Sequence, residues 1–256
     1  MSDNSFTVLG SSSGFPQAGR SCSGYLLKVG NSLSLLDCGG GVTKSFLKTG
    51  ADPLKVERIF ISHTHSDHVC ELSLFIQLIH LKGRTDRLDI YLPSEFVEIF
   101  GKYLYAVYLW QERMPFELKL VGYESGFEFN GGFSLKAYGT NHLKRYADDI
   151  GGLDTPNKMQ CHCFQIEVAN KRLFYSADLG GFEDVSKYLN GNDYVIIETT
   201  HINIEEFLSV SGEYNVGQYI LTHLGSPEEV TQIRQAISKN GVLNVSIAED
   251  GLELPL

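Results

Sequence analysis

The sequence lacks the features that mark membrane-spanning, secreted and disulfide-rich proteins. No apolar run approaches the ~20 residues that a transmembrane helix needs. Residues 1–5 have neither the basic segment nor the apolar core of a signal peptide. The five cysteines are odd in number and include no Cys-x-x-Cys pair, so reduced thiols fit better than a disulfide framework. These absences predict a cytoplasmic protein that does not contact a membrane.

Basic residues are also in deficit. The chain has 21 Lys and Arg against 31 Asp and Glu, a net charge of -10. Nucleic-acid-binding proteins usually carry a basic surface, so no strong nucleic-acid binding is expected. A small anionic or ester substrate at a cationic metal centre is still compatible with this charge. The 256 residues show no repeat or linker, which predicts one domain over residues 1–256.

Apolar periodicity separates strands from helices. Strand-like runs cover residues 6–9, 24–29, 34–37, 58–62, 89–92, 117–121, 127–129, 134–139, 160–168, 173–176, 194–198, 219–222 and 243–247. Helical patterns cover residues 41–47, 69–81, 94–110, 181–189, 203–208 and 227–238. Ser226 is expected to cap the last helix, since Pro227 and acidic residues follow it. The interleaved pattern predicts an α/β fold with two sheets between helical layers.

The densest group of reactive side chains follows the strand-like run at residues 58–61. His63, His65, Asp67 and His68 stand within six residues, where a strand ends and a helix begins. Ligand-binding residues of α/β enzymes lie at such positions, and imidazole with carboxylate suits zinc, iron or manganese. The alternating histidines point one way, and the Asp-His pair in the next turn can reach a neighbouring ion. Two metals sharing one loop is therefore the favoured interpretation, and a solvated loop that binds nothing is the alternative.

This motif resembles the signature of the metallo-β-lactamase-fold hydrolases. The resemblance continues in strand-like segments that end in Asp or His, at residues 35–41, 138–142, 173–178 and 219–223. The opening, residues 8–16 followed by 21–27, is similar to the ribonuclease Z branch and its phosphodiesterase relatives. The resemblance implies a four-layer αββα sandwich of the metallo-β-lactamase type, with metals at one edge.

The resemblance also implies a ligand set for two divalent ions. The first site would hold His63, His65 and His142, the second Asp67, His68 and His223, and Asp178 would bridge them. Zinc is favoured by the imidazole-rich set, with manganese or iron as alternatives where a carboxylate bridges. Water between two such ions is acidic enough to act as hydroxide near neutral pH. The alternatives are a loop histidine at position 142, a helix cap at position 178 and a turn cap at position 223.

Three residues are candidates for proton transfer. Asp67 could orient the attacking water and accept its proton, in addition to binding metal. Ribonuclease Z has a His-Glu pair on the strand that matches residues 194–201, but this chain has Ile197 before Glu198. His201 could replace that proton donor, or be a surface histidine. Glu198 is expected to orient a metal-binding histidine.

Other segments carry weaker signals. Lys144, Arg145 and Tyr146 could grip a phosphate, or belong to a solvated loop with a Gly-Gly hinge. The short stretch between His142 and Asp178 leaves no room for the long Gly- and basic-rich arm of ribonuclease Z. The Cys161-His162-Cys163 sequence is interpreted as core packing, and residues 11–14 as a tight turn near the metals. The aromatic residues at 103–110 are too close together to share one core face, so a homodimer interface or a cleft wall is considered.

These observations favour a dinuclear metal-dependent phosphodiesterase of small or nucleotide-like diesters. A ribonuclease Z-type tRNA 3′ endonuclease is the first alternative. It is disfavoured by Ile197, by the missing arm and by the acidic balance. A lactone or thioester hydrolase and a non-catalytic metal-binding module are the others. A complete ligand set argues against the last of these.

Overall fold

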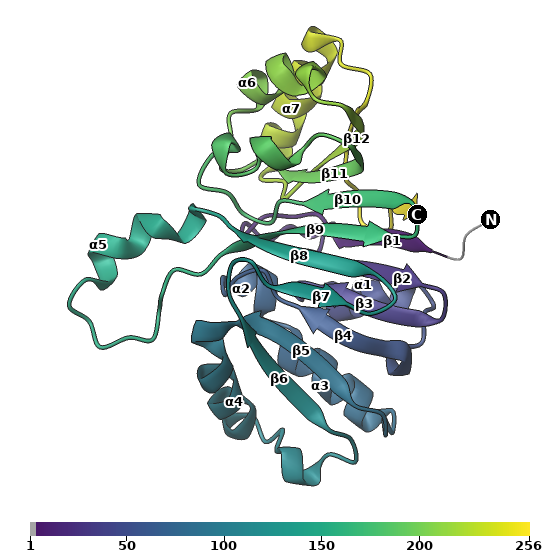
Figure 1. The fold of residues 1–256 in the computed structure, drawn as a ribbon, viewed down its shortest axis with the longest axis vertical. Helices are drawn as coiled ribbons and strands as arrows, with labels where there is room; N and C mark the ends of the chain where they lie inside the picture. The colour runs from purple at the N-terminus through teal and green to yellow at the C-terminus, as the bar shows by residue number, and fades with distance from the viewer. Residues whose placement is uncertain (1–3) are drawn as a thin grey trace.

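Two seven-stranded sheets form the middle of the molecule (Figure 1). The computed structural model describes residues 4–256. The first sheet has the order β14-β1-β2-β3-β4-β5-β6. Its strands are β1 (Ser5–Gly10), β2 (Gly24–Val29), β3 (Ser32–Leu36), β4 (Val56–Phe60), β5 (Leu88–Pro93), β6 (Leu118–Tyr123) and β14 (Glu253–Pro255).

The second sheet has the order β13-β12-β11-β10-β9-β8-β7. Its strands are β7 (Glu128–Asn130), β8 (Ser134–Gly139), β9 (His162–Val168), β10 (Lys171–Tyr175), β11 (Asn192–Glu198), β12 (Val216–Thr222) and β13 (Val245–Ile247). The helices are α1 (Val42–Lys48), α2 (Ser66–Val69), α3 (Leu72–Leu81), α4 (Val97–Ala106), α5 (Ala147–Ile150), α6 (Ile204–Val210) and α7 (Pro227–Asn240).

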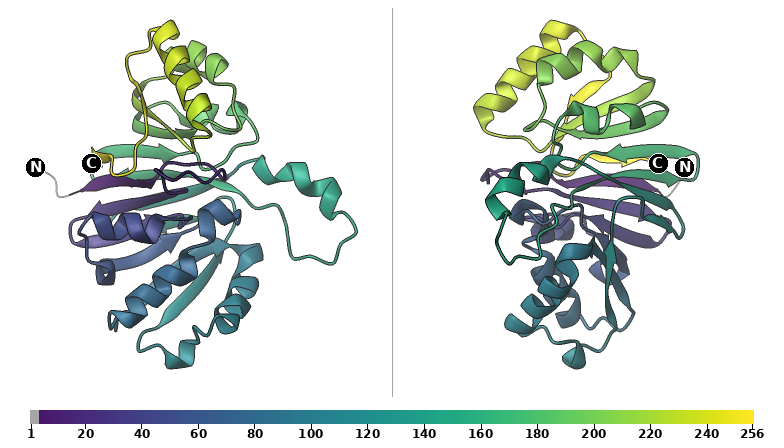
Figure 2. Two further views of the ribbon diagram at one scale, coloured as in Figure 1. Left: turned by 180° about the vertical axis from the view of Figure 1, so that it is seen from behind. Right: turned by 60° about the vertical axis from the view of Figure 1, so that its left-hand side comes forward.

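Side chains of the strands, which alternate between the two faces of each sheet, contribute to three apolar layers. Leu36 of β3 and Ile196 of β11 face the core between the two sheets. Their neighbour Leu35 packs into the core under α1, α3 and α4, and Val195 packs into the core under α6 and α7. Successive side chains of a strand point to opposite faces of the sheet. Both faces are covered here, so both are apolar. The predicted four-layer αββα sandwich of the metallo-β-lactamase type is confirmed (Figure 2).

The parallel parts of the two sheets bring distant loops to one edge. Strands β3, β4, β5 and β6 are parallel, as are β10, β11, β12 and β13. Strand β8 runs in the same direction as β10, because both pair antiparallel with β9. Carboxyl ends of parallel strands meet at the same sheet edge, so the segments that follow β3, β4, β8, β10, β11 and β12 lie together.

Two predicted helices differ from the structure, and strand β14 was not predicted. The helix predicted at residues 69–81 is broken into α2 and α3, because the Glu71 carboxylate turns to accept the backbone N–H groups of Gly41 and Thr43. The helix predicted at residues 181–189 is only two 3-10 turns. There the Asp184 carboxylate accepts backbone N–H groups and fixes a tight turn. Strand β14 has three residues and is too short to show alternation.

Other predictions about local structure hold. Ser226 caps α7 through a capping box with Glu229. All five cysteines are free thiols. Cys161 and Cys163 are buried, and the ring of His162 packs on Tyr123, in agreement with a packing role.

A segment around α5 projects from the body of the molecule (Figures 1 and 2). The loop predicted after His142 is thus a short projecting segment and not the long Gly- and basic-rich arm of ribonuclease Z. Its basic residues Lys144, Arg145 and Lys158 are balanced by Asp148, Asp149 and Asp154. An arm without net charge differs from the basic arm that was considered for tRNA.

The aromatic segment near α4 is partly exposed, as predicted. Tyr103, Tyr105 and Tyr108 expose 45%, 51% and 76% of their surface. They are not among the residues that line the pocket at the sheet edge, and their role stays a prediction. Within residues 4–256, no helix combines the length and the apolar character needed to cross a bilayer.

Candidate metal centre

The loops at the common sheet edge bring all seven predicted ligands together. Three overlapping groups are His63, His65, His142 and Asp178; Asp67, His68 and His223; and Asp178, His201 and His223. The possible ligand atoms within each group lie within 4.8 Å of one another. Asp178 belongs to two groups, and His201 joins the cluster although it was predicted only as a proton donor.

The two oxygens of Asp178 face different groups. Oδ2 lies 3.7 Å from Nε2 of His63 and 3.4 Å from Nε2 of His142. Oδ1 lies 3.1 Å from Nε2 of His68 and 3.3 Å from Nε2 of His223. A carboxylate with one oxygen toward each group has the geometry that a bridging ligand needs.

The motif after β4 is held by the start of a short helix. His65 is the N-cap residue of α2, so Asp67 and His68 lie in its first turn. The backbone of this turn is tied to the loop after β3, because the Cys38 N–H donates to the His68 carbonyl at 2.7 Å. The helix turn sends Asp67 and His68 in a different direction from His63 and His65, as the sequence predicts.

Backbone strain is concentrated at the ends of the strands that carry the site. Asp37, Ala177 and His223 have positive φ values of 57°, 46° and 55°. Left-handed conformations are costly for residues with a Cβ and persist only where surrounding structure imposes them. These strained residues end or follow β3, β10 and β12, and each directs a candidate ligand or its partner into the cluster.

Asp37 is a functional residue that sequence analysis did not assign. Its buried carboxylate accepts hydrogen bonds from Nδ1 of His68 at 2.8 Å, from the hydroxyl of Tyr175 at 2.7 Å, and from the N–H and hydroxyl of Ser62 at 2.7 and 2.8 Å. A carboxylate on Nδ1 fixes the ring so that Nε2 points at the cluster. Its place at the end of β3 was visible in the sequence, but its partner on another loop was not.

Burial keeps the histidines of the first group neutral. It lowers the pKa of His63 well below the usual value, lowers the pKa of His65, and lowers the pKa of His142 to about 3. Neutral imidazole is the form of histidine that binds metals. The first group is therefore ready at neutral pH to offer lone pairs to a cation.

Asp178 sets the charge of the second group. Burial disfavours its ionisation, but His223 and His68 outweigh burial and hold the pKa of Asp178 well below its usual range. The pKa of His68 is raised because Asp178 and Asp37 outweigh its burial. The pKa of His223 is raised against burial by Asp178 and Asp67. A divalent cation bound here would replace protons on these histidines.

Unpaired polar atoms show that the cluster fits metal ions. Among residues 4–256, Nε2 of His63, Nε2 of His68 and Oδ1 of Asp178 are buried without a well-aligned hydrogen bond, although the last two atoms lie 3.1 Å apart. Such atoms are costly to bury unless something binds them. All three point into the cluster, and nitrogen and carboxylate oxygen are suitable donors for zinc. The donor set therefore fits divalent metal.

Glu198 contacts a histidine of the cluster that lies outside the predicted ligand set. Its Oε2 lies 4.0 Å from Nδ1 of His223, which is too far for a hydrogen bond. Its carboxylate instead contacts Nδ1 of His201 at 3.1 Å and accepts the N–H groups of Leu179, Thr200 and His201. Nδ1 of His223 contacts the hydroxyl of Thr200 at 3.2 Å. Glu198 thus orients His201, a histidine of the cluster, and does not bond to His223.

A pocket of about 450 Å³ opens over the cluster. His65, Asp67, Asp178, His201 and His223 line its inner part. Arg145 is its one cationic lining residue, and its guanidinium donates to the Tyr146 hydroxyl at 3.0 Å. Of the predicted phosphate contacts, the structure brings Arg145 to the site and leaves Lys144 outside its lining.

The turn at residues 11–14 borders this pocket, as predicted. Ser13 and Gly14 are lining residues. A Cβ on Gly14 would lie 3.3 Å from the Asp67 carboxylate. The glycine therefore lets the turn approach Asp67 closely.

The comparisons with known proteins agree with this geometry. A family model described as "Anti-Pycsar protein Apyc1" matches residues 4–214. This range includes every predicted ligand except His223. The metallo-β-lactamase-fold protein YhfI from Bacillus subtilis has a TM-score of 0.80 and 22% identity, with 99% of each chain covered.

Ribonuclease Z proteins are among the relatives. That of Methanococcus aeolicus is 23% identical over 309 aligned positions, which cover 97% of this chain and 96% of that protein. That of Methanothermobacter thermautotrophicus is 38% identical over 93 residues, which cover 36% of this chain and only 30% of that protein. The predicted resemblance to the ribonuclease Z and phosphodiesterase branch of the metallo-β-lactamase fold is confirmed.

Proposed function

The chain belongs to the family of the anti-Pycsar protein Apyc1, and from that premise we propose that it is a phosphodiesterase of small or nucleotide-like phosphodiesters. Its family and its ribonuclease Z relatives make it a metal-dependent hydrolase. The observation that carries the proposal is a convergent cluster of His and Asp ligands beneath a pocket with a single cationic lining residue.

The proposed metal sites use the predicted ligands. His63, His65 and His142 would hold one ion and Asp67, His68 and His223 the other, with Asp178 between them. Zinc is the proposed metal, with manganese or iron as alternatives. Bound divalent ions would supply Lewis acidity toward water and the phosphate oxygens.

The chain's own residues supply the remaining chemistry. Asp67 lies at the pocket, with its Oδ2 3.1 Å from Nε2 of His223, and is proposed to orient water and accept its proton. His201 lines the same pocket and is held by Glu198. It is the proposed proton donor to the leaving oxygen, since Ile197 is buried in the apolar core. Arg145 is proposed to contact a substrate phosphate oxygen.

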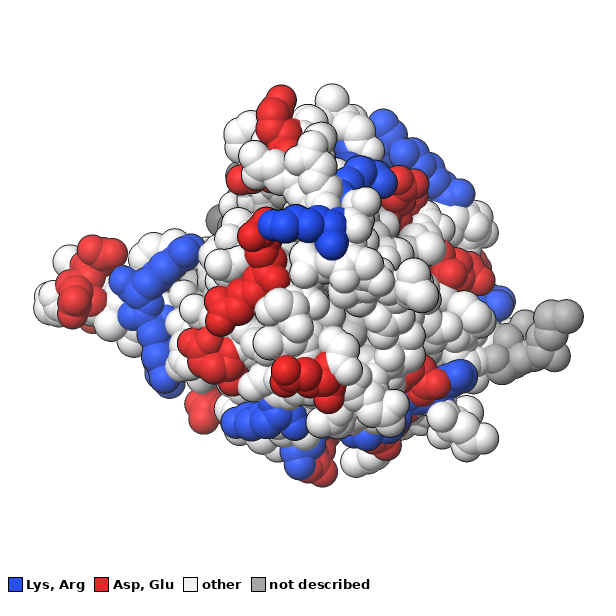
Figure 3. Space-filling view, turned by 90° about the horizontal axis from the view of Figure 1, so that it is seen from above, with Lys and Arg blue, Asp and Glu red and all other residues white. Residues whose placement is uncertain are grey.

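Charge supports a small substrate. A long polyanion needs several basic contacts to be held, and the pocket offers one. On the face shown in Figure 3, basic and acidic side chains are interspersed, and acidic residues gather at the tip of the projecting segment. The proposal therefore includes the expectation that this chain binds RNA only weakly.

The ribonuclease Z alternative is favoured by two observations. Curated relatives carry that name, and a short segment around α5 projects from the body of the molecule. The arm has no charge excess, and Ile197 stands where that branch has a histidine. The single domain, the cytoplasmic location and the homodimer stay predictions.

The test is a substrate panel with the zinc-loaded full chain. Bis-p-nitrophenyl phosphate and nucleoside cyclic phosphates are expected to be cleaved, with much slower reaction of p-nitrophenyl phosphate and lactones. Precursor tRNA is included at physiological salt. Site-specific tRNA cleavage without any activity on small diesters would replace the proposal by the ribonuclease Z alternative.

A further inference from the structure

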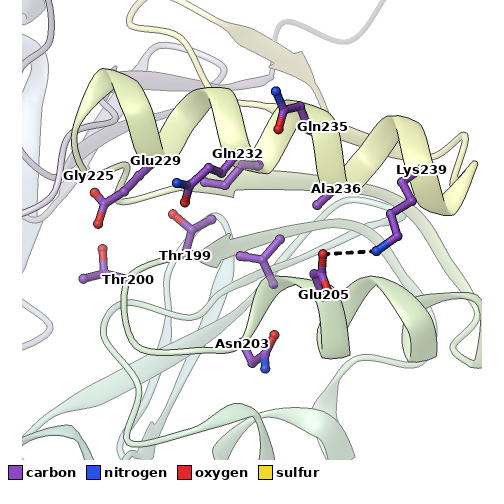
Figure 4. Close-up of a pocket in the computed structure, with 12 residues that line it drawn as sticks. Thr199, Thr200, Asn203, Glu205, Gly225, Glu229, Gln232, Gln235, Ala236 and Lys239 are labelled. Carbon is purple, nitrogen blue, oxygen red and sulfur yellow. Dashed lines mark hydrogen bonds and ion pairs between the residues drawn. The ribbon is translucent and has the colours of Figure 1, made fainter.

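A second groove lies beside the metal pocket, between α6 and α7 (Figure 4). Its volume is about 550 Å³. It shares Thr200, Gly225 and Glu229 with the lining of the metal pocket. The two cavities therefore adjoin at these residues.

The shared wall is tied directly to the metal cluster. The Thr200 hydroxyl donates to the His223 carbonyl at 2.8 Å and contacts Nδ1 of the same residue at 3.2 Å. Thr199 makes weaker contacts with the same carbonyl, at 3.3 Å. A substrate group bound against these threonines would be adjacent to a phosphate at the cluster.

The chemistry of the groove suits a neutral group with hydrogen-bonding edges. Ile204, Ile233 and Ala236 line it and belong to or pack on the apolar core below α6 and α7. Figure 4 shows Glu229 and Gln232 of α7 pointing toward Thr199 and Thr200. An apolar surface rimmed by amides and hydroxyls accommodates the face and the edge of a heterocyclic ring.

The Gln232 and Asn203 amides have free donors. Oδ1 of Asn203 accepts the Glu206 N–H as the N-cap of α6, which leaves its amide hydrogens available. Within residues 4–256, the side chain of Gln232 makes no hydrogen bond. Gln232 comes from α7 and Asn203 from the N-cap of α6, so the two amides belong to opposite sides of the groove lining.

The charged residues that line the two cavities determine which end of a substrate each cavity favours. The lining includes Glu205 and Glu229 against Lys239 alone, and Lys239 pairs with Glu205 at 3.4 Å. Glu229 lines both cavities, so the difference between them is that the metal pocket has Arg145, whereas the one Lys or Arg that lines this groove is already paired. The uncharged end of a diester is therefore favoured in this groove, while its phosphate is favoured beside Arg145 and the metal cluster.

We propose that the groove between α6 and α7 binds the base-bearing end of a nucleotide-like diester, with Gln232 and Asn203 as specificity-determining residues. This rests on the proposed function, because the phosphate is assigned to the metal cluster. Between Glu229 and Ala236 the helix spans about 10 Å at ~1.5 Å per residue, which is room for more than a phosphate ester alone.

The test compares diesters that differ only in the nucleoside. Wild type is expected to cleave the 5′-p-nitrophenyl esters of thymidylate or adenylate with a higher kcat/KM than methyl p-nitrophenyl phosphate. Gln232→Ala combined with Asn203→Ser, which keeps a helix-capping hydroxyl, should raise KM for the nucleotide esters roughly tenfold. The methyl ester should react as with wild type. Gln77→Ala, at an exposed glutamine of α3, is the matched control and should change neither.

Binding of free nucleosides to the metal-free chain separates the two proposals. Saturation-transfer NMR should detect thymidine or adenosine on wild type and lose the signal with the double variant. If wild type cleaves no diester but binds nucleoside in this way, the proposed function fails and the groove assignment survives. If the esters are cleaved without preference, or the double variant leaves the preference unchanged, the groove assignment is overturned.

Discussion

The carboxylate of Asp37 accepts a hydrogen bond from Nδ1 of His68 at 2.8 Å, and both side chains are fully buried. They come from the ends of neighbouring parallel strands, β3 and β4. Through this contact a residue outside the candidate ligand set determines the orientation of a ligand within it.

Replacing Asp37 should therefore affect both stability and metal binding. Asp37→Ala is expected to lower the free energy of unfolding by about 3 kcal/mol, because buried donors lose their acceptor. Metal affinity should fall about 10- to 100-fold. Tyr175→Phe removes one donor to the same carboxylate and should cost about 1 kcal/mol with little change in affinity. Chemical denaturation and competition with a chromogenic chelator measure the two effects, and unchanged affinity in Asp37→Ala would exclude the orienting role.

Much of this site was predictable from sequence because the ligands follow recognisable strands. His63, His65 and His68 lie in one compact motif, and His142, Asp178 and His223 each follow a strand of the predicted sheet. The role of Asp37 was not predictable, because it depends on which strands become neighbours. The Glu198 partner was missed for a related reason: the turn after β11 folds His201 back onto it.

The helical errors have a similar origin. Residues 69–81 and 181–189 have helical periodicity, but Glu71 and Asp184 use their carboxylates to bind backbone N–H groups of other segments. Local periodicity contains no information about such long-range contacts. The turn residues after His142 predict a loop, but how far the segment near α5 projects depends on packing and not on the local sequence.

Two metal ions should bind each chain, with Asp178 needed by both. The oxygens of Asp178 face different histidine groups, so Asp178→Ala is expected to lose both ions rather than one. His162→Gln is the control, since His162 is buried outside the cluster against Tyr123. It should keep both ions. Elemental analysis after zinc loading measures the ratio, and one ion per wild-type chain would rule out the paired site.

Asp67 and His65 should be essential for hydrolysis but not for folding. Both line the pocket. Loss of Asp67, which is proposed to position and deprotonate the attacking water, or of His65, a proposed metal ligand, is expected to lower kcat about 1,000-fold. Asp67→Ala and His65→Ala should keep the wild-type circular dichroism spectrum. Asp67→Asn retains the shape of the side chain without its basicity and should be nearly as slow. Near-normal turnover of Asp67→Ala with both metals bound would contradict the assigned role.

His201 should matter only when the leaving group needs a proton. Its ring lies 4.5 Å from that of His142 and is held by Glu198 at 3.1 Å, which places it beside the cluster and in the pocket lining. His201→Ala is expected to slow a diester with an alkoxide leaving group roughly 100-fold, because alkoxide is a poor leaving group without protonation. A p-nitrophenyl diester should lose little activity, because p-nitrophenolate leaves readily as an anion. Glu198→Gln should show the same selectivity to a smaller degree, since it weakens only the orientation of the donor. Equal losses on both substrates, accompanied by a lower zinc content, would instead assign His201 to metal binding with Asp178 and His223.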